Sequence, residues 1–299
     1  MSGPVICVVG AGTAGLEGLL YAREALGPDA ELRLIAPDRD FRYRPMSEDS
    51  LFRPAAERRL AVADVVSHAG ATWIVDRAEV IRESERSVLT RNGDTVGFDY
   101  LLLTPGARQV PALRQGHVWQ RGGDPGFLDQ IISGLRAGTA HTVAVVVPEG
   151  ARWPLPAYEL ALVLAWTAAG TGARITLLTA EQRPLGVLGA EATRVVTEEL
   201  DDAGVTFISG TAVADDPAGA PPDRIRVHCG AGSPVAFDQL ISLPTVLGPH
   251  ITGVATDAAG FIEVDGSLLV CGSERVWAAG DCVASALDHS ALAARQADA

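Results

Sequence analysis

The chain has 299 residues, of which 47% are hydrophobic and 20% charged, so it is long enough for two domains with a large buried core. Its formal net charge of -13 opposes binding to a polyanion, and we expect no nucleic-acid partner. The longest apolar helical segment, residues 160–169, is too short to cross a bilayer, and the N-terminus has no signal segment. This predicts a cytoplasmic protein with no transmembrane segment.

The first organised segment is an apolar strand, Val5–Val9, followed by a glycine turn and a helix. Gly10, Gly12 and Gly15 have the spacing of a dinucleotide-binding turn. In that turn the first glycine permits tight bending, the second lets backbone approach a pyrophosphate, and the third lets helix pack on strand. The N–H groups and positive dipole of a helix N-terminus favour an anion there. Because a second apolar strand follows at residues 32–36, we predict a nucleotide-binding turn rather than an unoccupied one.

The second strand ends in Ala36, Pro37 and Asp38, where an NAD-binding fold usually carries an acid that binds the ribose. Asp38 is close enough to take this role, and the backbone beside Pro37 is an alternative. Arg44 and Pro45 lie in the loop that follows, which either contacts a cofactor or is an ordinary solvated loop.

Residues 60–104 contain short β-rich runs, and Asn92-Gly93 predicts a hairpin turn between two of them. This pattern indicates an antiparallel excursion after the first βαβ unit. It ends where an apolar strand meets Thr104, Pro105 and Gly106.

A second βαβ pattern follows, with strands at 142–147, 174–178 and 205–208 and helices at about 156–168 and 190–203. Its first turn keeps only Gly150 of any glycine pattern. The prolines of the turn, Pro148, Pro154 and Pro156, cannot donate backbone N–H groups, and Trp153 would obstruct close approach of a ligand. We therefore expect no second nucleotide in the usual pose.

Short strands are predicted at 225–229 and 239–243, and a last strand at 276–279 ends at Gly280 and Asp281. An aspartate just beyond an apolar strand and a glycine is well placed to accept hydrogen bonds from sugar or ribityl hydroxyls. Capping the next helix is the alternative, and both roles can coexist. An alanine-rich helix is predicted from about His289.

The four cysteines, Cys7, Cys229, Cys271 and Cys282, form no CxxC motif and no paired metal spacing. We expect free thiols and no metal site.

Three motifs together resemble the FAD-binding signatures of the two-dinucleotide-domain flavoproteins, the pyridine nucleotide-disulphide oxidoreductase superfamily. They are the N-terminal glycine turn, the strand ending in Thr104-Pro-Gly and the late strand ending in Ala-Ala-Gly-Asp281. Residues 36–45, the Pro-rich helix start at 153–159 and residues 292–297 resemble the sulfide:quinone reductase-like branch of that superfamily.

The resemblance implies an α/β fold with two Rossmann-like βαβ domains of the FAD/NAD(P)-binding type, the second inserted in the first, and an antiparallel β excursion. The FAD-binding domain would comprise residues 1–112 and 237–299, and the second domain, with its degenerate nucleotide turn, residues 113–236. The family's C-terminal region, which covers the flavin and contributes quinone binding, membrane attachment or dimerisation, would be absent. The chain would then be truncated or need a partner, so a homodimer, a partner subunit and peripheral membrane association stay open.

The resemblance also implies FAD as the cofactor and assigns its contacts residue by residue. The pyrophosphate would be held by Gly10, Gly12, Thr13, Ala14 and Gly15, the adenosine ribose by Ala36, Pro37 and Asp38, and the adenine by the backbone of Ala78. Gly106 would lie near the FAD, and Gly280 and Asp281 would bind ribityl and phosphate oxygens. The flavin pyrimidine edge would face a helix N-terminus at His289, Ser290 and Ala291, whose positive end would raise the reduction potential.

Our leading hypothesis is an FAD-dependent oxidoreductase that passes electrons from a small reductant to an acceptor such as a quinone. It would lack the redox cysteines of sulfide oxidation, since Trp153 stands near one of their positions, and would not use NAD(P)H in the usual site. The alternatives are a non-catalytic FAD-binding or partner subunit and an NAD(P)H-dependent flavin reductase. No catalytic residue is assigned; Glu159 is the first acid to test, with a first-turn helix role as the alternative.

Overall fold

The computed structural model describes residues 3–42, 59–119, 126–217 and 224–284. The chain divides into two compact units, of which the first combines residues 1–108 with 247–299 and the second is formed by 109–246. The predicted α/β fold class is confirmed, because each unit contains a five-stranded sheet whose paired strands are all parallel.

The first unit is built on the sheet β20-β9-β1-β2-β5. Its strands are β1 (Val5–Val9), β2 (Glu31–Ile35), β5 (Thr72–Ile74), β9 (Tyr100–Leu103) and β20 (Val276–Ala278). The final residues of neighbouring strands pair directly, so all five strands end level at one edge. The loops that follow the strands therefore gather at that edge.

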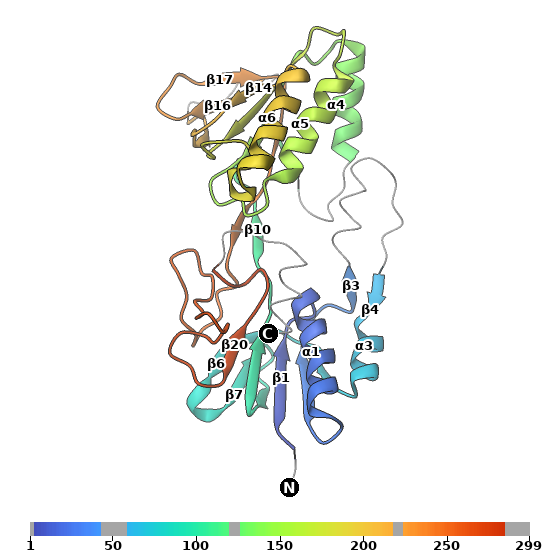
Figure 1. Cartoon of the computed structure of the whole chain (residues 1–299), viewed down its shortest axis with the longest axis vertical. Helices are drawn as coiled ribbons and strands as arrows, with labels where there is room; N and C mark the ends of the chain where they lie inside the picture. The colour runs from blue at the N-terminus through green and yellow to red at the C-terminus, as the bar shows by residue number, and fades with distance from the viewer. Residues whose placement is uncertain (1–2, 43–58, 120–125, 218–223, 285–299) are drawn as a thin grey trace. The chain divides into compact units, whose positions relative to one another are not determined.

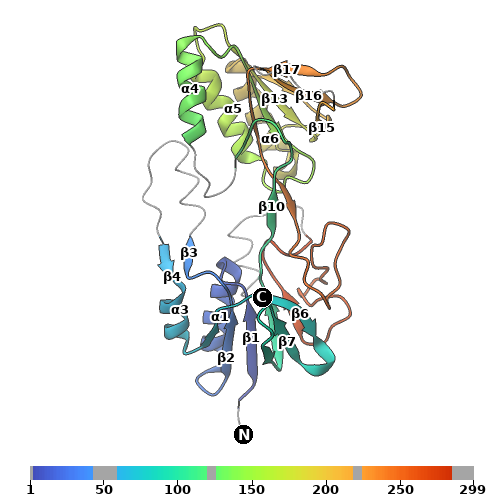
Figure 2. The same cartoon turned by 180° about the vertical axis from the view of Figure 1, so that it is seen from behind.

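The two faces of this sheet are covered differently. Helices α1 (Thr13–Leu26) and α3 (Val62–Ala69) lie on one side, and the antiparallel sheet of β6 (Ala78–Arg82), β7 (Ser87–Thr90) and β8 (Thr95–Gly97) lies on the other (Figures 1 and 2). Side chains of β1 alternate between them: Val8 packs with the helices, while Cys7 and Val9 join the core under the antiparallel strands. Burial on both faces explains why β1 is apolar throughout. Strands β3 (Asp40–Arg42) and β4 (Arg59–Ala61) form a separate hairpin pair.

The ends of α1 and α3 are joined by one side chain. Arg23 donates from Nε to the Ala69 carbonyl (2.6 Å), from Nη1 to the Gly27 carbonyl (2.5 Å) and from Nη2 to the Gly70 carbonyl (3.4 Å). Carbonyls at helix C-termini lack partners within the helix and carry the negative end of the dipole. The half-buried guanidinium of Arg23 thus stabilises the C-terminal ends of both helices.

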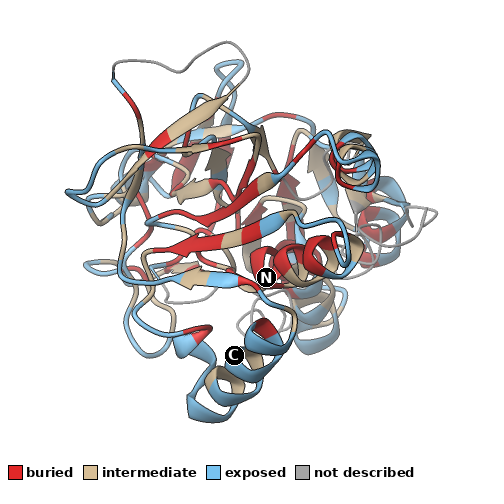
Figure 3. Cartoon of the chain, turned by 90° about the horizontal axis from the view of Figure 1, so that it is seen from above, coloured by how far each residue is buried: buried red, intermediate tan, exposed pale blue. Residues whose placement is uncertain are grey.

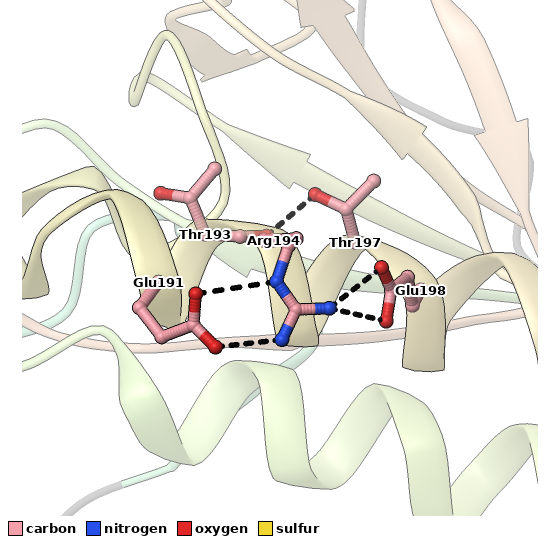
Figure 4. A network of polar contacts seen from close by, with 5 residues as sticks. All are labelled: Glu191, Thr193, Arg194, Thr197 and Glu198. Atoms are coloured by element: carbon pink, nitrogen blue, oxygen red, sulfur yellow. Dashed lines mark hydrogen bonds and ion pairs between the residues drawn. The ribbon is translucent and has the colours of Figure 1, made fainter.

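We expect Arg23→Ala to destabilise the first unit by about 2–4 kcal/mol, because hydrogen bonds from a charged donor contribute about 1.5–3 kcal/mol each and one of these is long. Thermal and urea unfolding followed by circular dichroism would measure the loss. The control is Arg194→Ala in the second unit, where the guanidinium bonds only to the exposed Glu191 and Glu198 of its own helix (Figure 4). Exposed pairs of that kind contribute little. Equal losses of stability in the two variants would contradict the role of Arg23 in joining the ends of α1 and α3.

The second unit has the same architecture. Its parallel sheet has the order β11-β18-β12-β13-β14, and three strands pair in a separate antiparallel sheet. The parallel strands are β11 (His117–Val118), β12 (Thr142–Val147), β13 (Arg174–Thr179), β14 (Thr206–Ile208) and β18 (Gln239–Ser242). The antiparallel strands are β15 (Val213–Asp215), β16 (Ile225–Cys229) and β17 (Val235–Phe237), and the helices are α4 (Gly126–Ala137), α5 (Leu155–Thr167) and α6 (Ala190–Asp202). Figure 3 shows that buried residues concentrate on the strands and that exposed residues lie on the outer faces of the helices.

One strand lies in a different unit from the one expected. The predicted return segment began at residue 237, but β18 pairs with β12 in the sheet of the second unit, with Val145 opposite Ile241. The short sequence of β18, Gln-Leu-Ile-Ser, has no alternating pattern that would reveal which sheet buries it. Strands β10 (Arg108–Val110) and β19 (Thr245–Leu247), where the chain passes between the units, pair with each other. Within the described part of the chain, no helix has the length and apolar character needed to span a membrane.

Candidate functional site

The strongest site feature is the level edge where the strands of the first unit end. The chain leaves β1 toward β2 on one side, while β9 and β20 lie on the other, so the strand order reverses between β1 and β9. Open parallel sheets bind ligands outside the carboxyl ends of their strands at such a reversal. The glycine turn follows β1, and Thr104 follows β9 directly beside it.

Two glycines of the turn are required by backbone packing. Gly10 has a φ of +103°, and a Cβ built on it would lie 2.2 Å from the Thr104 carbonyl oxygen. A Cβ on Gly15 would lie 2.0 Å from the Gly10 carbonyl oxygen and 2.6 Å from Thr104 Oγ1. The turn, the start of α1 and the end of β9 are therefore in contact at distances that exclude any side chain, as the spacing predicted.

Gly12 differs from both, because a Cβ built on it would meet no protein atom within 4 Å. It has an ordinary φ of -80° and is the N-cap of α1. Among the described residues no side chain caps this helix N-terminus, and its first turn carries no acid. The open side of Gly12 and the uncapped N–H groups of Thr13 and Ala14 form a cradle that fits a pyrophosphate.

The late Gly-Asp motif reaches the same edge. Ala279 and Ala14 pack in one small buried cluster, which brings the end of β20 to the start of α1. Gly280 has a φ of +80° and turns the chain so that Asp281 follows at the sheet edge, half-buried. Gly106, with a φ of +72° and no atom within 4 Å of a built Cβ, follows β9 at the neighbouring position. Three segments distant in sequence thus meet at one edge.

The predicted ribose contacts follow the end of β2, and the structure shows which of their polar groups already have partners. Ala36 is fully buried, its N–H donates to the Ile74 carbonyl, and its carbonyl accepts from the Trp73 indole N–H at 3.0 Å. Both polar groups of Ala36 are engaged inside the protein. The contacts left for a ribose are the half-buried Pro37 and the exposed carboxylate of Asp38.

The predicted adenine contact, Ala78, opens β6 four residues after β5 ends, with its side chain half-buried. The remaining predicted contacts, Arg44, Pro45, His289, Ser290 and Ala291, lie outside the described residues.

Thr104 contributes more to this edge than its sequence motif indicated. Its hydroxyl is buried and donates to the Val9 carbonyl at 2.7 Å, with a longer contact of 3.3 Å to the Gly10 carbonyl. The motif Thr-Pro-Gly drew attention to Gly106, and the role of the hydroxyl two residues earlier was missed. A hydroxyl residue directly after a buried strand that ends beside a glycine turn is the signal that points to it.

In the second unit, the turn between β12 and α5 is held by hydrogen bonds within its own backbone. Ala151 N–H donates to the Pro148 carbonyl, and Ala157 N–H donates to the Pro154 carbonyl. Pro156 has no N–H to donate. A Cβ on Gly150 would lie 2.9 Å from Thr245 Cγ2, so this glycine serves packing within the unit. Few donors of the first turn of α5 are available to an anion.

An acid that the sequence reasoning missed lies two residues beyond β13. The Glu181 carboxylate accepts from the Tyr158 hydroxyl at 2.6 Å and from the Thr179 hydroxyl at 3.3 Å. Burial raises the pKa of the Glu181 carboxyl, and burial together with Glu181 raises the pKa of the Tyr158 hydroxyl, which is therefore the proton donor of the pair. An acid after the second strand is where nucleotide folds bind ribose, and the same rule that pointed to Asp38 could have found it.

The four cysteines form no disulfide in the structure. All four are free, and Cys282 is fully buried, with its thiol donating to the Ala279 carbonyl at 3.2 Å and to the Leu103 carbonyl at 3.4 Å. Burial, with a smaller contribution from Asp281, raises the pKa of Cys282 to about 12. Burial also raises the pKa of Cys7 to about 12. Since the thiolate is the nucleophile, both are inert in the folded protein.

We expect iodoacetamide at pH 8 to alkylate the exposed Cys271 in the native protein and to leave Cys7 and Cys282 unmodified, because only about one Cys282 in ten thousand would be a thiolate at that pH. Peptide mass spectrometry would measure each site, and denatured protein is the control in which all are modified. Native alkylation of Cys282 at the rate of Cys271 would contradict its burial as an inert thiol.

Comparisons with known proteins show which proteins the chain resembles. The sequence profile of the family described as "Pyridine nucleotide-disulphide oxidoreductase" matches residues 159–297. An NADH dehydrogenase-like protein of Mycobacterium tuberculosis strain H37Rv is 27% identical, over 96% of this chain and 74% of its own length.

Two solved structures share the fold. The sulfide:quinone oxidoreductase of Aquifex aeolicus has a TM-score of 0.83 at 19% identity and covers 99% of this chain and 75% of its own. The water-forming NADH oxidase of Lactobacillus brevis has a TM-score of 0.67 at 18% identity, over 99% of this chain and 68% of its own. The family profile, the relative and the fold agree, and the chain is similar to pyridine nucleotide-disulphide oxidoreductases.

Proposed function

We propose that the first unit binds FAD in an extended pose along the level edge of its sheet, and that the protein passes electrons from a small-molecule donor through FAD to an acceptor such as a quinone. Bound FAD would supply the hydride and electron chemistry, while the chain supplies position and electrostatics. Its pyrophosphate would lie on Gly10, Gly12, Thr13, Ala14 and Gly15, with Asp38 at the ribose, Ala78 at the adenine, and Gly106, Gly280 and Asp281 toward the ribityl chain.

The observation that carries this proposal is the contrast among the three glycines. Gly10 and Gly15 face protein backbone, whereas Gly12 faces open space in front of an uncapped helix N-terminus. A glycine is needed at Gly12 only if something outside the protein approaches its backbone closely. The quinone is proposed from the name of the Aquifex aeolicus neighbour, a sulfide:quinone oxidoreductase.

The second candidate is an NADH-dependent reductase, which Glu181 favours. Its half-buried carboxylate lies beyond β13, where a ribose-binding acid is expected, and hydrogen bonds from Tyr158 and Thr179 orient it. The name of the Mycobacterium tuberculosis relative, NADH dehydrogenase-like, agrees with this reading. The closed turn at Pro148, Pro154 and Pro156 opposes it, because a pyrophosphate would find few N–H donors there.

The test is to purify the chain, record its flavin spectrum and mix it anaerobically with NADH, NADPH and sulfide in turn, with a soluble quinone as acceptor. Flavin that stays oxidised with NADH and NADPH, but is bleached by a non-nucleotide donor and reoxidised by quinone, would support the leading proposal. A colourless protein that cannot be reconstituted with FAD would contradict both candidates.

Bleaching by NADH would favour the second candidate, and Glu181→Gln provides its matched control. If Glu181 binds the ribose, this variant raises the KM for NADH and leaves the flavin spectrum and the limiting rate unchanged. An unchanged KM would show that NADH reacts elsewhere. A yellow protein inert to every reductant would favour the non-catalytic FAD-binding subunit.

A further inference from the structure

The hydroxyl of Thr104 is buried and contacts the carbonyls of the glycine turn from inside the protein. Thr104 is 4% exposed and stands at the first position after β9. Its backbone N–H already donates to the Val9 carbonyl at 2.7 Å, so the side chain is not needed to close the β1–β9 pairing.

The hydroxyl contacts two successive carbonyls of the turn. It lies 2.7 Å from the Val9 oxygen and 3.3 Å from the Gly10 oxygen. A hydroxyl has one proton, so the short contact is the main hydrogen bond and the longer one is its second branch. Together they hold the Gly10 carbonyl on the buried side of the turn.

The orientation of that carbonyl sets the next donor. Gly10 C=O and Ala11 N–H belong to one peptide group, and the described chain contains no cis peptide bond. In a trans peptide the N–H points opposite to the C=O. With the Gly10 oxygen held toward Thr104, the Ala11 N–H points away from the Thr104 hydroxyl.

The same hydroxyl fills the space beneath the start of α1. A Cβ on Gly15 would lie 2.6 Å from Thr104 Oγ1, so the Gly15 backbone packs directly on it. Gly10 N–H donates to the Ile35 carbonyl at 2.9 Å, which fixes the turn from the β2 side. Thr104 fixes it from the β9 side.

We propose that Thr104 is a positioning residue for FAD, because its hydroxyl orients the Gly10–Ala11 peptide so that the Ala11 N–H donates to the pyrophosphate. The inference rests on the proposed function, in which FAD binds at this turn. It adds a residue that acts through the protein backbone and sets the affinity of the turn for the pyrophosphate.

The test compares three variants of the full chain by the dissociation constant for FAD and the thermal midpoint of the FAD-free protein. Thr104→Ser keeps the hydroxyl and should bind FAD within about threefold of the unchanged chain. Thr104→Val puts a methyl group where the hydroxyl contacts two carbonyls and should weaken binding about 10–100-fold, as expected for one lost charge-assisted hydrogen bond. Thr104→Ala removes the hydroxyl without a new methyl contact and keeps the test valid if the valine variant does not fold.

A spectroscopic readout separates positioning from loss of stability. The ³¹P resonances of bound FAD should shift in the alanine variant and match the unchanged chain in the serine variant, because they report hydrogen bonds to the pyrophosphate. FAD affinity and ³¹P spectra in Thr104→Ala equal to those of the unchanged chain would overturn the inference alone. Failure of the unchanged chain to bind FAD would overturn the inference and the proposed function together.

Discussion

Gly15→Ala is expected to unfold the first unit and abolish FAD binding. The new Cβ would lie 2.0 Å from the Gly10 carbonyl oxygen, and real Cβ atoms essentially never approach another heavy atom within 3.0 Å. The obstacle is backbone fixed between β1 and β9, so it cannot rotate away as a side chain would. We expect a cost above about 3 kcal/mol, the upper part of the range for overpacking, in a domain whose total stability is on the order of 5–15 kcal/mol.

Gly12→Ala provides the matched control, three residues away in the same turn. Its φ of -80° suits alanine, and the added Cβ meets no protein atom within 4 Å. The FAD-free protein should keep or gain a few tenths of a kcal/mol of stability, since the unfolded chain loses conformational freedom. FAD affinity should nevertheless fall at least about tenfold, because the methyl group occupies the space that the pyrophosphate would need.

Thermal unfolding of the FAD-free variants and flavin fluorescence titrations would separate the two effects. A folded Gly15→Ala variant that binds FAD normally would show that the turn is not packed as described. Normal FAD affinity in Gly12→Ala would place the ligand elsewhere and weaken the observation on which the proposed function rests.

Asp281→Ala is expected to weaken FAD binding about 10–100-fold, since a hydrogen bond to a charged group contributes about 1.5–3 kcal/mol and each 1.4 kcal/mol is tenfold in affinity. The carboxylate follows Gly280 at the sheet edge, beside the Ala14–Ala279 contact that joins β20 to the start of α1. Asp281→Asn should lose less, because the amide oxygen still accepts a hydrogen bond.

The control for this prediction is Asp265→Ala in the same unit. The Asp265 carboxylate accepts from Ser267 and Leu269 within its own exposed turn, and these bonds lower its pKa. Its loss should lower stability without changing FAD affinity. Equal FAD affinities for the Asp281→Ala variant and the unchanged chain would show that this acid only closes the turn after β20.

Sequence patterns predicted most of the first unit because its local signals agree. The apolar run Val5–Val9, the glycine spacing and the strand before Thr104 each determine their own structure, and the structure has all three. The hairpin at Asn92-Gly93 also formed as expected, joining β7 to β8. Local chemistry of this kind needs no knowledge of distant partners.

Contacts between distant segments were the part that sequence could not supply. Nothing local to β18 says that its four residues pair with β12. The residues around Ala36 do not indicate that the Trp73 indole N–H donates to the Ala36 carbonyl. Those around Glu181 do not indicate that the Tyr158 hydroxyl donates to its carboxylate. Each depends on the register of strands that the pattern of hydrophobic residues leaves open.

The interrupted first unit has a consequence for synthesis. Its sheet needs β20, and the Cys282 thiol bonds to the Leu103 carbonyl, a residue 179 positions earlier in the chain. The second unit, residues 109–246, has all its strands before the last segment of the first unit leaves the ribosome. The second unit can fold as the chain emerges from the ribosome. One edge of β9 stays unpaired until β20 has been synthesised. The five-stranded sheet of the first unit is therefore complete only after β20 has been synthesised.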